Sequence, residues 1–214
     1  MRVGIVSDIH CNVRGLEKAL QLMGDIDELF CAGDSVFQFR WSNEVIALLK
    51  ARDAHVIQGN HEEIILGPDG VRALSAPFVD ASLVAWLRER PFHLETEVDG
   101  KRILMTHSSP WEPHRDYHYP GEAIWARAAD LDVDTVIVGH THHKMAERFG
   151  STLVINPGST GDARDHRNGY QLSSAVWDTA TDEVTFYEYQ DSARASVPQA
   201  VQSAADGESP RATA

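Results

Sequence analysis

Cysteine is scarce in this chain of 214 residues, which contains only Cys11 and Cys31. Two cysteines do not make the disulfide framework of a small secreted domain, so we expect reduced thiols and a cytoplasmic protein. Long apolar runs are also missing. No stretch approaches the roughly eighteen apolar residues that a membrane-spanning helix needs, and the chain starts without the apolar segment of a signal peptide. We therefore expect no membrane partner.

Positive charge is low as well, because 19 Lys and Arg stand against 32 Asp and Glu, a formal net charge of −13. Binding to duplex nucleic acid depends on basic surfaces that neutralise phosphates, so this charge argues against such a partner. A small phosphorylated substrate stays compatible with an acidic chain if bound cations reverse the local charge. The composition also includes 11 histidines, an unusual number that requires an explanation.

The order of apolar runs and turn residues predicts an α/β fold. Short apolar runs at 3–6, 29–32 and 54–57 alternate with helical patterns after Asn12 and Ser42, as in parallel β-α-β units. Further strands are predicted at 95–98, 102–105, 135–138, 153–155, 174–177 and 184–189, and further helices at 81–88 and 123–129. The first two of these strands flank Asp99-Gly100, which is typical of a hairpin. We expect two sheets with helices outside.

The end of the chain differs in composition from the rest. From about Asp191 the residues are mainly Ala, Ser, Pro, Gln and Gly without apolar periodicity. Such a segment cannot bury enough apolar surface to order itself. We expect one domain over residues 1–190 and a disordered tail over 191–214.

Five short motifs follow predicted strands. They are Asp8-Ile9-His10, Gly33-Asp34, Gly59-Asn60-His61-Glu62, Thr106-His107 and Gly139-His140-Thr141-His142. The carboxyl ends of parallel strands share one edge of a sheet, so we expect the motifs to converge there. The two-residue spacing of Asp8 and His10 puts both side chains on one side of an extended segment. All five motifs in this order are very improbable by chance.

These motifs supply oxygen and imidazole ligands and no thiolate. The candidate metal ligands are Asp8, His10, Asp34, Asn60, His107, His140 and His142. This set is too large for one ion, and it divides naturally over two ions that share a carboxylate, as in two-metal hydrolases. Mixed oxygen and nitrogen sets suit Mn, Fe, Zn, Ni or Co. We expect two divalent cations, with Mn²⁺ first and Fe, Ni, Zn and Co as alternatives.

Together with Asn12, Ser108-Ser109-Pro110 and Asn156-Pro157-Gly158-Ser159, the motifs resemble the calcineurin-like metallophosphoesterases, in particular the small stand-alone bacterial phosphodiesterase-type members. The resemblance covers about residues 1–190. It implies a four-layer α/β/β/α sandwich of two mixed sheets that hydrolyses phosphoesters at a dinuclear metal site.

The resemblance also implies a role for each position. Asp8, His10 and His142 would bind one ion, Asn60, His107 and His140 would bind the other, and Asp34 would bridge them. A hydroxide that bridges the metals would attack phosphorus. His61, beside Asn60 in the catalytic motif, would act as the general acid that protonates the leaving group. Glu62 either orients His61 or caps a helix.

Departures from the family pattern bear on the substrate. Gly33-Asp34 is followed by Ser35-Val36 without the Arg of the protein phosphatases and dinucleoside tetraphosphatases, and Gln58 replaces an Arg of the protein phosphatases. Without these guanidiniums, phosphodiesters or small organic phosphates are favoured over phosphoproteins. A protein or dinucleoside-polyphosphate phosphatase stays an alternative. So does a non-catalytic scaffold on the same fold, although every ligand position is filled.

Candidate substrate contacts lie in two loops. The aromatic and basic loop 111–120 either lies over the site, with His114 and His118 touching substrate, or forms a surface or subunit contact. Arg164 either binds a substrate phosphate or is solvated. Relatives of this kind often assemble as dimers or larger, so a homo-oligomer stays compatible with the sequence, which shows no interface signature.

Overall fold

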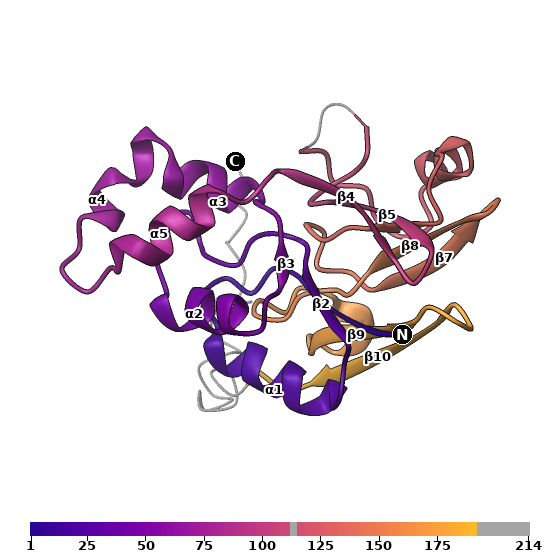
Figure 1. Cartoon of the computed structure of the whole chain (residues 1–214), viewed down its shortest axis with the longest axis horizontal. Helices are drawn as coiled ribbons and strands as arrows, with labels where there is room; N and C mark the ends of the chain where they lie inside the picture. The colour runs from indigo at the N-terminus through magenta and orange to yellow at the C-terminus, as the bar shows by residue number, and fades with distance from the viewer. Residues whose placement is uncertain (112–114, 192–214) are drawn as a thin grey trace, which may run out of the picture.

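The structure is a computed structural model, and it describes residues 1–111 and 115–191. Two five-stranded mixed sheets pack face to face, with strand orders β10-β9-β1-β2-β3 and β4-β5-β6-β8-β7 (Figure 1). His114 and the expected tail beyond Asp191 lie outside the described residues. Within the described part of the chain, no helix is long and apolar enough to span a membrane.

The first sheet contains β1 (Arg2–Val6), β2 (Glu28–Cys31), β3 (His55–Val56), β9 (Leu172–Asp178) and β10 (Glu183–Tyr189). Strands β1, β2 and β3 pair in parallel, as predicted, whereas β9 pairs antiparallel with both β1 and β10. The crossovers contain α1 (Val13–Met23) and α2 (Asn43–Ala51). The side chains of Asn12 and Ser42 accept hydrogen bonds from the first turns of these helices, which fixes where each begins.

The second sheet contains β4 (His93–Val98), β5 (Lys101–Thr106), β6 (Thr135–Ile137), β7 (Met145–Phe149) and β8 (Thr152–Asn156). The predicted hairpin is confirmed, because β4 and β5 pair antiparallel around Asp99-Gly100. Strands β5, β6 and β8 are parallel, and β7 adds an antiparallel edge that the sequence patterns did not predict. The 3₁₀ helix η2 (Ala123–Asp130) replaces the predicted helix at 123–129.

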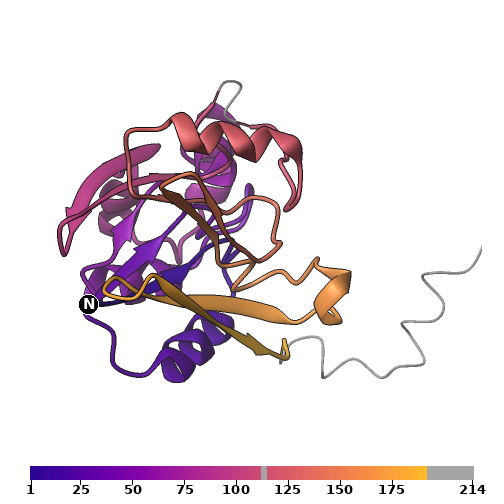
Figure 2. The same cartoon turned by 90° about the vertical axis from the view of Figure 1, so that its right-hand side faces the viewer.

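Apolar side chains fill the space between the sheets and beneath the helices. Ile5 and Phe30 of the first sheet pack with Met105 and Trp177 in the central layer. On the outer face of the first sheet, Leu16 and other residues of α1 and α2 form a second cluster. η2 covers the outer face of the second sheet. Figure 2 shows the sheets stacked between η2 at the top and α1 at the bottom, which confirms the four-layer fold.

The segment after β3 contains helices that the sequence patterns missed. α3 (Asn60–Leu66) is followed by η1 (Pro68–Gly70), α4 (Val71–Leu74) and the predicted α5 (Ala81–Arg88), and η3 (His166–Asn168) lies later in the chain. α3 begins inside the Gly59-Asn60-His61-Glu62 motif, so one short stretch contains both a turn and a helix start. This arrangement fixes the position of the motif at the end of β3.

Candidate metal centre

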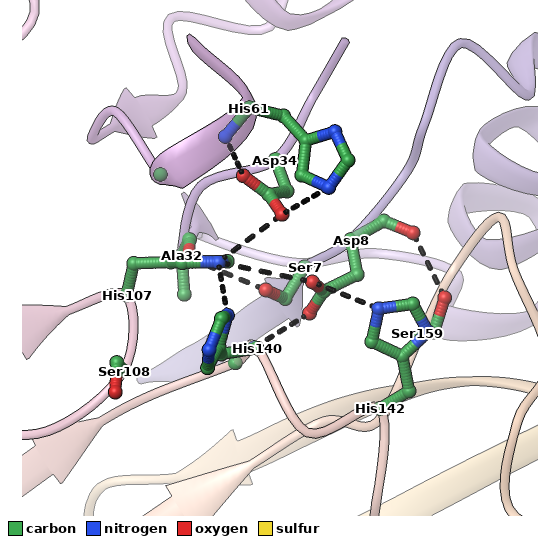
Figure 3. A network of polar contacts seen from close by, with 12 residues as sticks. Ser7, Asp8, Ala32, Asp34, His61, His107, Ser108, His140, His142 and Ser159 are labelled. Atoms are coloured by element: carbon green, nitrogen blue, oxygen red, sulfur yellow. Dashed lines mark hydrogen bonds and ion pairs between the residues drawn. The ribbon is translucent and has the colours of Figure 1, made fainter. Parts of the chain in front are cut away.

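The five motifs converge at one end of the molecule, but two sheets supply them. The loops after β1 and β2 and the start of α3 belong to the first sheet, whereas the loops after β5 and β6 belong to the second. The expectation of a single sheet edge was therefore wrong. The site lies where the ends of the facing sheets meet, and Figure 3 shows side chains from both sheets pointing toward one another there.

Left-handed backbone conformations aim many of the candidate ligands. The φ angles are 51° for Asp8, 48° for His10, 51° for Asp34, 66° for His140 and 59° for His142. Such conformations of non-glycine residues cost about 1–3 kcal/mol each and cluster at functional sites. The prediction of an extended Asp8-Ile9-His10 segment was wrong, because β1 ends before it and the positive φ angles orient its side chains instead.

One group of candidate ligands contains Asp8, His10 and His142, all buried, with ligand atoms within 4.8 Å of one another. The Nε2 atom of His142 lies 3.2 Å from Asp8 Oδ1 and 3.2 Å from His10 Nε2. His142 Nδ1 lies 2.6 Å from the carbonyl oxygen of Asp162, so it is the nitrogen that donates. The lone pair of the neutral ring therefore sits on Nε2 and faces the group.

A second group contains Asp34, His107 and His140, also buried and within the same 4.8 Å. His107 Nε2 lies 3.2 Å from Asp34 Oδ2 and 3.2 Å from His140 Nδ1. The outer ring nitrogens face carbonyl oxygens, with His107 Nδ1 2.7 Å from Ala32 and His140 Nε2 3.1 Å from Arg115. In the neutral form of each ring, donation to these carbonyls puts the lone pair on the inner nitrogen, where it can bind a cation, a pattern common around metal-ligating histidines.

Asp34 lies between the groups. Its Oδ2 atom is close to His107 and also lies 3.7 Å from His61 Nε2, and Figure 3 shows the carboxylate between these two rings. Its Oδ1 atom accepts a hydrogen bond from the backbone N–H of His61. A third set of possible ligand atoms, from His10, Asp34 and His61, overlaps both groups. A carboxylate in this place can serve two ions.

Two buried oxygens test whether these residues fit cations. Asp8 Oδ1 and Asn60 Oδ1 are buried and have no hydrogen-bond partner among the described residues. Leaving such atoms unsatisfied costs about 1–3 kcal/mol each, and a cation satisfies them. The donor set of carboxylate, amide and imidazole matches the preferences of first-row divalent ions. The residues present therefore fit a pair of divalent cations.

The charges of the cluster also suit cations. Burial alone would raise the pKa of the Asp8 carboxyl, but the neighbouring imidazoles hold it well below its ordinary value. Burial lowers the pKa of His10 and of His140 to about 4, so both rings are neutral near pH 7. His107 differs: burial would lower its pKa, but the carboxylates of Asp34 and Asp8 raise it to about 10.

His61 is held in one tautomer. Its Nδ1 accepts a hydrogen bond of 2.9 Å from the backbone N–H of Gln38. Because a backbone N–H can only donate, the proton of the neutral His61 ring is on Nε2. Burial lowers the pKa of His61. Its ring centroid lies 4.7 Å from that of His10 and 4.6 Å from that of Phe37. His61 thus presents an N–H donor beside the first ligand group.

Glu62 is a helix cap that also holds the Asp34 loop. It is fully buried, and its Oε2 accepts hydrogen bonds from the backbone N–H groups of Gly59 at 2.8 Å and Asp34 at 2.9 Å. Its Oε1 accepts from Ser35 Oγ at 2.6 Å and from Val36 N at 3.0 Å. Of the two interpretations of Glu62, the structure supports the capping one.

Residues without an assigned role in the sequence fix the remaining loops. Asn156 Nδ2 donates to the carbonyl oxygen of Gly139, and Ser159 Oγ donates to that of Asp8. A Cβ atom on Gly139 would lie 1.9 Å from Ser7 Oγ, so only glycine allows this approach. The Asn156-Pro157-Gly158-Ser159 motif was the signal for this support, which lies outside the ligand set.

Arg164 lies next to the first ligand group. Its Nε and Nη2 atoms are 2.8 and 2.7 Å from Asp162 Oδ2, and Asp162 is the residue whose carbonyl oxygen faces His142. The side chain is 45% exposed, so the guanidinium is available to solvent and to a ligand. This placement is compatible with a phosphate contact.

Neighbouring side chains of the segment 117–119 point in different directions. His118 packs edge-on against Trp125, at 6.2 Å between ring centroids, and its Nδ1 lies 3.6 Å from Glu122. Tyr117 instead stacks on the ligand candidate His140 with centroids 3.9 Å apart. The structure thus places His118 against η2 and brings to the site a residue that the sequence did not single out.

Several known proteins are similar to this chain in sequence or in fold. A phosphodiesterase of Methanocaldococcus jannaschii is 27% identical over 168 residues, which cover 74% of this chain and 83% of that protein. An uncharacterized protein of the same archaeon is 25% identical over 198 residues, or 78% of this chain and 79% of that protein. A solved metallophosphoesterase structure from Sphaerobacter thermophilus has a TM-score of 0.73 at 23% identity and covers 94% of this chain and 97% of that one.

A family model, the calcineurin-like phosphoesterase superfamily domain, matches residues 1–182. The match includes all candidate ligands and every strand of both sheets except β10. The expected family and fold are confirmed, and the buried Asp and His groups agree with the metal dependence of this family. The chain therefore belongs to the calcineurin-like phosphoesterase superfamily and is a hydrolase of phosphate esters.

Proposed function

We propose that the protein hydrolyses phosphodiesters or small organic phosphates at a site that holds two divalent cations. Asp8, His10 and His142 would hold one cation, Asn60, His107 and His140 would hold the other, and Asp34 would serve both. The orientation of three histidines carries this proposal, because each turns one ring nitrogen to a backbone carbonyl oxygen and the other into the site. The inner nitrogen of His142 faces Asp8, that of His107 faces Asp34, and that of His140 faces the inner nitrogen of His107.

The cations and the residues around them would have different roles in the reaction. Bound cations supply an activated water and neutralise phosphoryl oxygens. As the proposed acid, His61 would donate a hydrogen bond from its Nε2–H to the leaving-group oxygen and stabilise the charge that develops there, because the N–H of Gln38 occupies Nδ1 and keeps the proton of the neutral ring on Nε2. Phe37 packs against His61 and restricts its rotation. Asn60 would be a ligand, and its unpartnered Oδ1 supports that role.

The substrate is proposed from charge and from the relatives. The relative named a phosphodiesterase supports a diester substrate for this chain. The net charge of −13 supports a small substrate over a polyanionic duplex. Arg164 beside Asp162 would contact a phosphate, and Tyr117 takes the place that we expected for His118. We place Mn²⁺ first among the cations, with Fe, Ni, Zn and Co as alternatives.

The domain extent, cellular location and oligomeric state of the protein are also part of the proposal. We propose that residues 1–190 form the catalytic domain. The free Cys11 and Cys31 support a reducing, cytoplasmic location. A homo-oligomer stays compatible with these features.

The test is turnover after removal and return of metal. Chelated protein should be inactive toward aryl phosphodiesters and monoesters, and Mn²⁺ should restore activity. Asp34→Asn should lose most of this activity because it disturbs both cation sites, whereas His55→Ala, at the half-exposed pair with Glu28, should retain it. Activity that survives chelation would contradict the metal site. Metal binding without turnover of any ester would favour the scaffold alternative.

A further inference from the structure

A cavity of about 540 Å³ opens directly beside the second ligand group. Asn60 and His107 form part of its wall, so a molecule in the cavity touches the metal centre. The outer face of the β4–β5 hairpin forms the opposite wall, through residues such as Glu95 and Leu104. η2 packs on the same face against Val136 of β6, and Leu104 of β5 both packs against this cluster and lines the cavity.

The cavity borders the second ligand group, whereas the ring of His61 packs beside His10 of the first group. His61 contacts His10 and Phe37, at ring-centroid distances of 4.7 and 4.6 Å. The cavity is bordered instead by Asn60 and His107. In an in-line displacement the leaving oxygen departs toward the acid. A substituent in the cavity is then not the leaving group but the one that stays on phosphorus, and a monoester has no such substituent.

The chemistry of the cavity selects the kind of substituent. Phe92, which is 53% exposed, and Leu104 offer apolar surface for a flat ring. Glu95 offers a carboxylate that accepts hydrogen bonds from N–H or O–H donors and repels a second phosphate. Arg115 forms an ion pair with Glu63, so the two charges neutralise each other. The volume falls within the roughly 300–1,000 Å³ of ordinary ligand pockets.

We propose that this cavity binds the retained substituent of a phosphodiester, and that this substituent is an uncharged ring-bearing group such as a nucleoside. The proposal rests on the proposed function, since it needs phosphorus at the metal centre. It makes the protein a diesterase in preference to a monoesterase. Phe92, Leu104 and Glu95 are then specificity-determining residues.

The experiment uses substrates with one leaving group and different retained groups. 4-Nitrophenyl thymidine 5′-phosphate retains a nucleoside, methyl 4-nitrophenyl phosphate retains a methyl group, and 4-nitrophenyl phosphate retains nothing. With Mn²⁺, kcat/KM should be about tenfold or more higher for the nucleoside ester than for either other substrate, as expected for an apolar pocket that gains a ring. Equal values for the three substrates would overturn the proposal.

Two variants connect this preference to the cavity. Phe92→Ala removes an exposed ring and Leu104→Trp fills the cavity, and each should lower the nucleoside-to-methyl ratio of kcat/KM by about tenfold. The matched controls are Phe78→Ala, at a ring that is 63% exposed, and Leu74→Trp, at a different surface hollow. Both should keep the parent ratio.

The outcomes separate the two proposals. If Leu104→Trp does not fold, Phe92→Ala still tests the proposal, because a substitution at an exposed position leaves the fold intact. An unchanged ratio in Phe92→Ala, with metal-dependent activity intact, overturns the cavity assignment and leaves the proposed function standing. Failure to cleave any of the three esters with any divalent ion contradicts the proposed function itself.

Discussion

The buried carboxylate of Glu62 accepts a hydrogen bond from the backbone N–H of Asp34, 2.9 Å away. The same carboxylate oxygen accepts from Gly59 at the start of α3, so Glu62 connects the loop after β2 to the helix after β3. The position of Asp34, the candidate bridging ligand, thus depends on a residue that is not among the candidate ligands. Its backbone would shift if this connection were lost.

Glu62→Gln tests this connection. The amide replaces an acceptor oxygen by an NH₂ group that faces backbone donors, so buried donors lose their partner. We expect the free energy of unfolding to fall by about 2–4 kcal/mol. Urea unfolding of the metal-free protein measures the change, and Glu63→Gln, at the exposed neighbour, is the control for the loss of one charge. Equal stability of the two variants would show that Glu62 does not hold the loop.

Replacement of His61 should affect leaving groups unequally. His61→Ala removes the N–H donor beside the first ligand group but none of the proposed ligands. Turnover of an alkyl ester, whose leaving group needs a proton, should fall about 10²–10⁴-fold, and turnover of a 4-nitrophenyl ester should fall much less. Metal content should stay at the parent level by elemental analysis. An equal loss with both leaving groups would point to a structural role.

Tyr117 should support His140 through its ring. Tyr117→Leu removes the stacked ring that lies 3.9 Å from His140, whereas Tyr117→Phe keeps it. Aromatic pairs contribute about 0.5–1.5 kcal/mol, so we expect Mn²⁺ affinity of the Leu variant to fall by up to about tenfold. Competition with a chelating dye measures this affinity. The idea fails if the Phe variant loses as much affinity as the Leu variant.

Cation binding should release protons. Asp34 and Asp8 overcome the effect of burial and raise the pKa of His107 to about 10, so in the cation-free protein both nitrogens of this ring carry a proton at pH 7, including Nε2. A cation must displace that proton to use Nε2, and its apparent affinity should therefore rise with pH up to about 10.

Calorimetric titration with Mn²⁺ in two buffers of different ionisation enthalpy counts the protons released. His55→Ala, at a ring that pairs with Glu28, should release the same number as the parent. Binding that releases no proton between pH 6.5 and 8 would contradict the assignment of His107 as a ligand.

Local patterns predicted much of the fold. The strand and helix periods of the first sixty residues and the Asp99-Gly100 hairpin are properties of neighbouring residues, and all are found in the structure. α3 and β7 were not predicted because no local pattern marks either element. α3 starts within a functional motif, and β7 has no buried alternation that distinguishes it from a loop, since its three central residues are exposed.

The sequence alone determined which atoms can do chemistry here. Asp, Asn and His in five spaced motifs predict a site for divalent cations, because the ligand preferences of these cations depend on atom type and not on fold. The resemblance of the same motifs to a known family implies phosphoester hydrolysis. The tertiary structure decided where those atoms point. The meeting of two sheets, the left-handed φ angles of Asp8 and His140, and the turn of Tyr117 rather than His118 toward the site all depend on contacts between distant segments. The periodicity of a sequence depends only on residues that are close along the chain, whereas the direction of a side chain depends on the distant segments that pack against it.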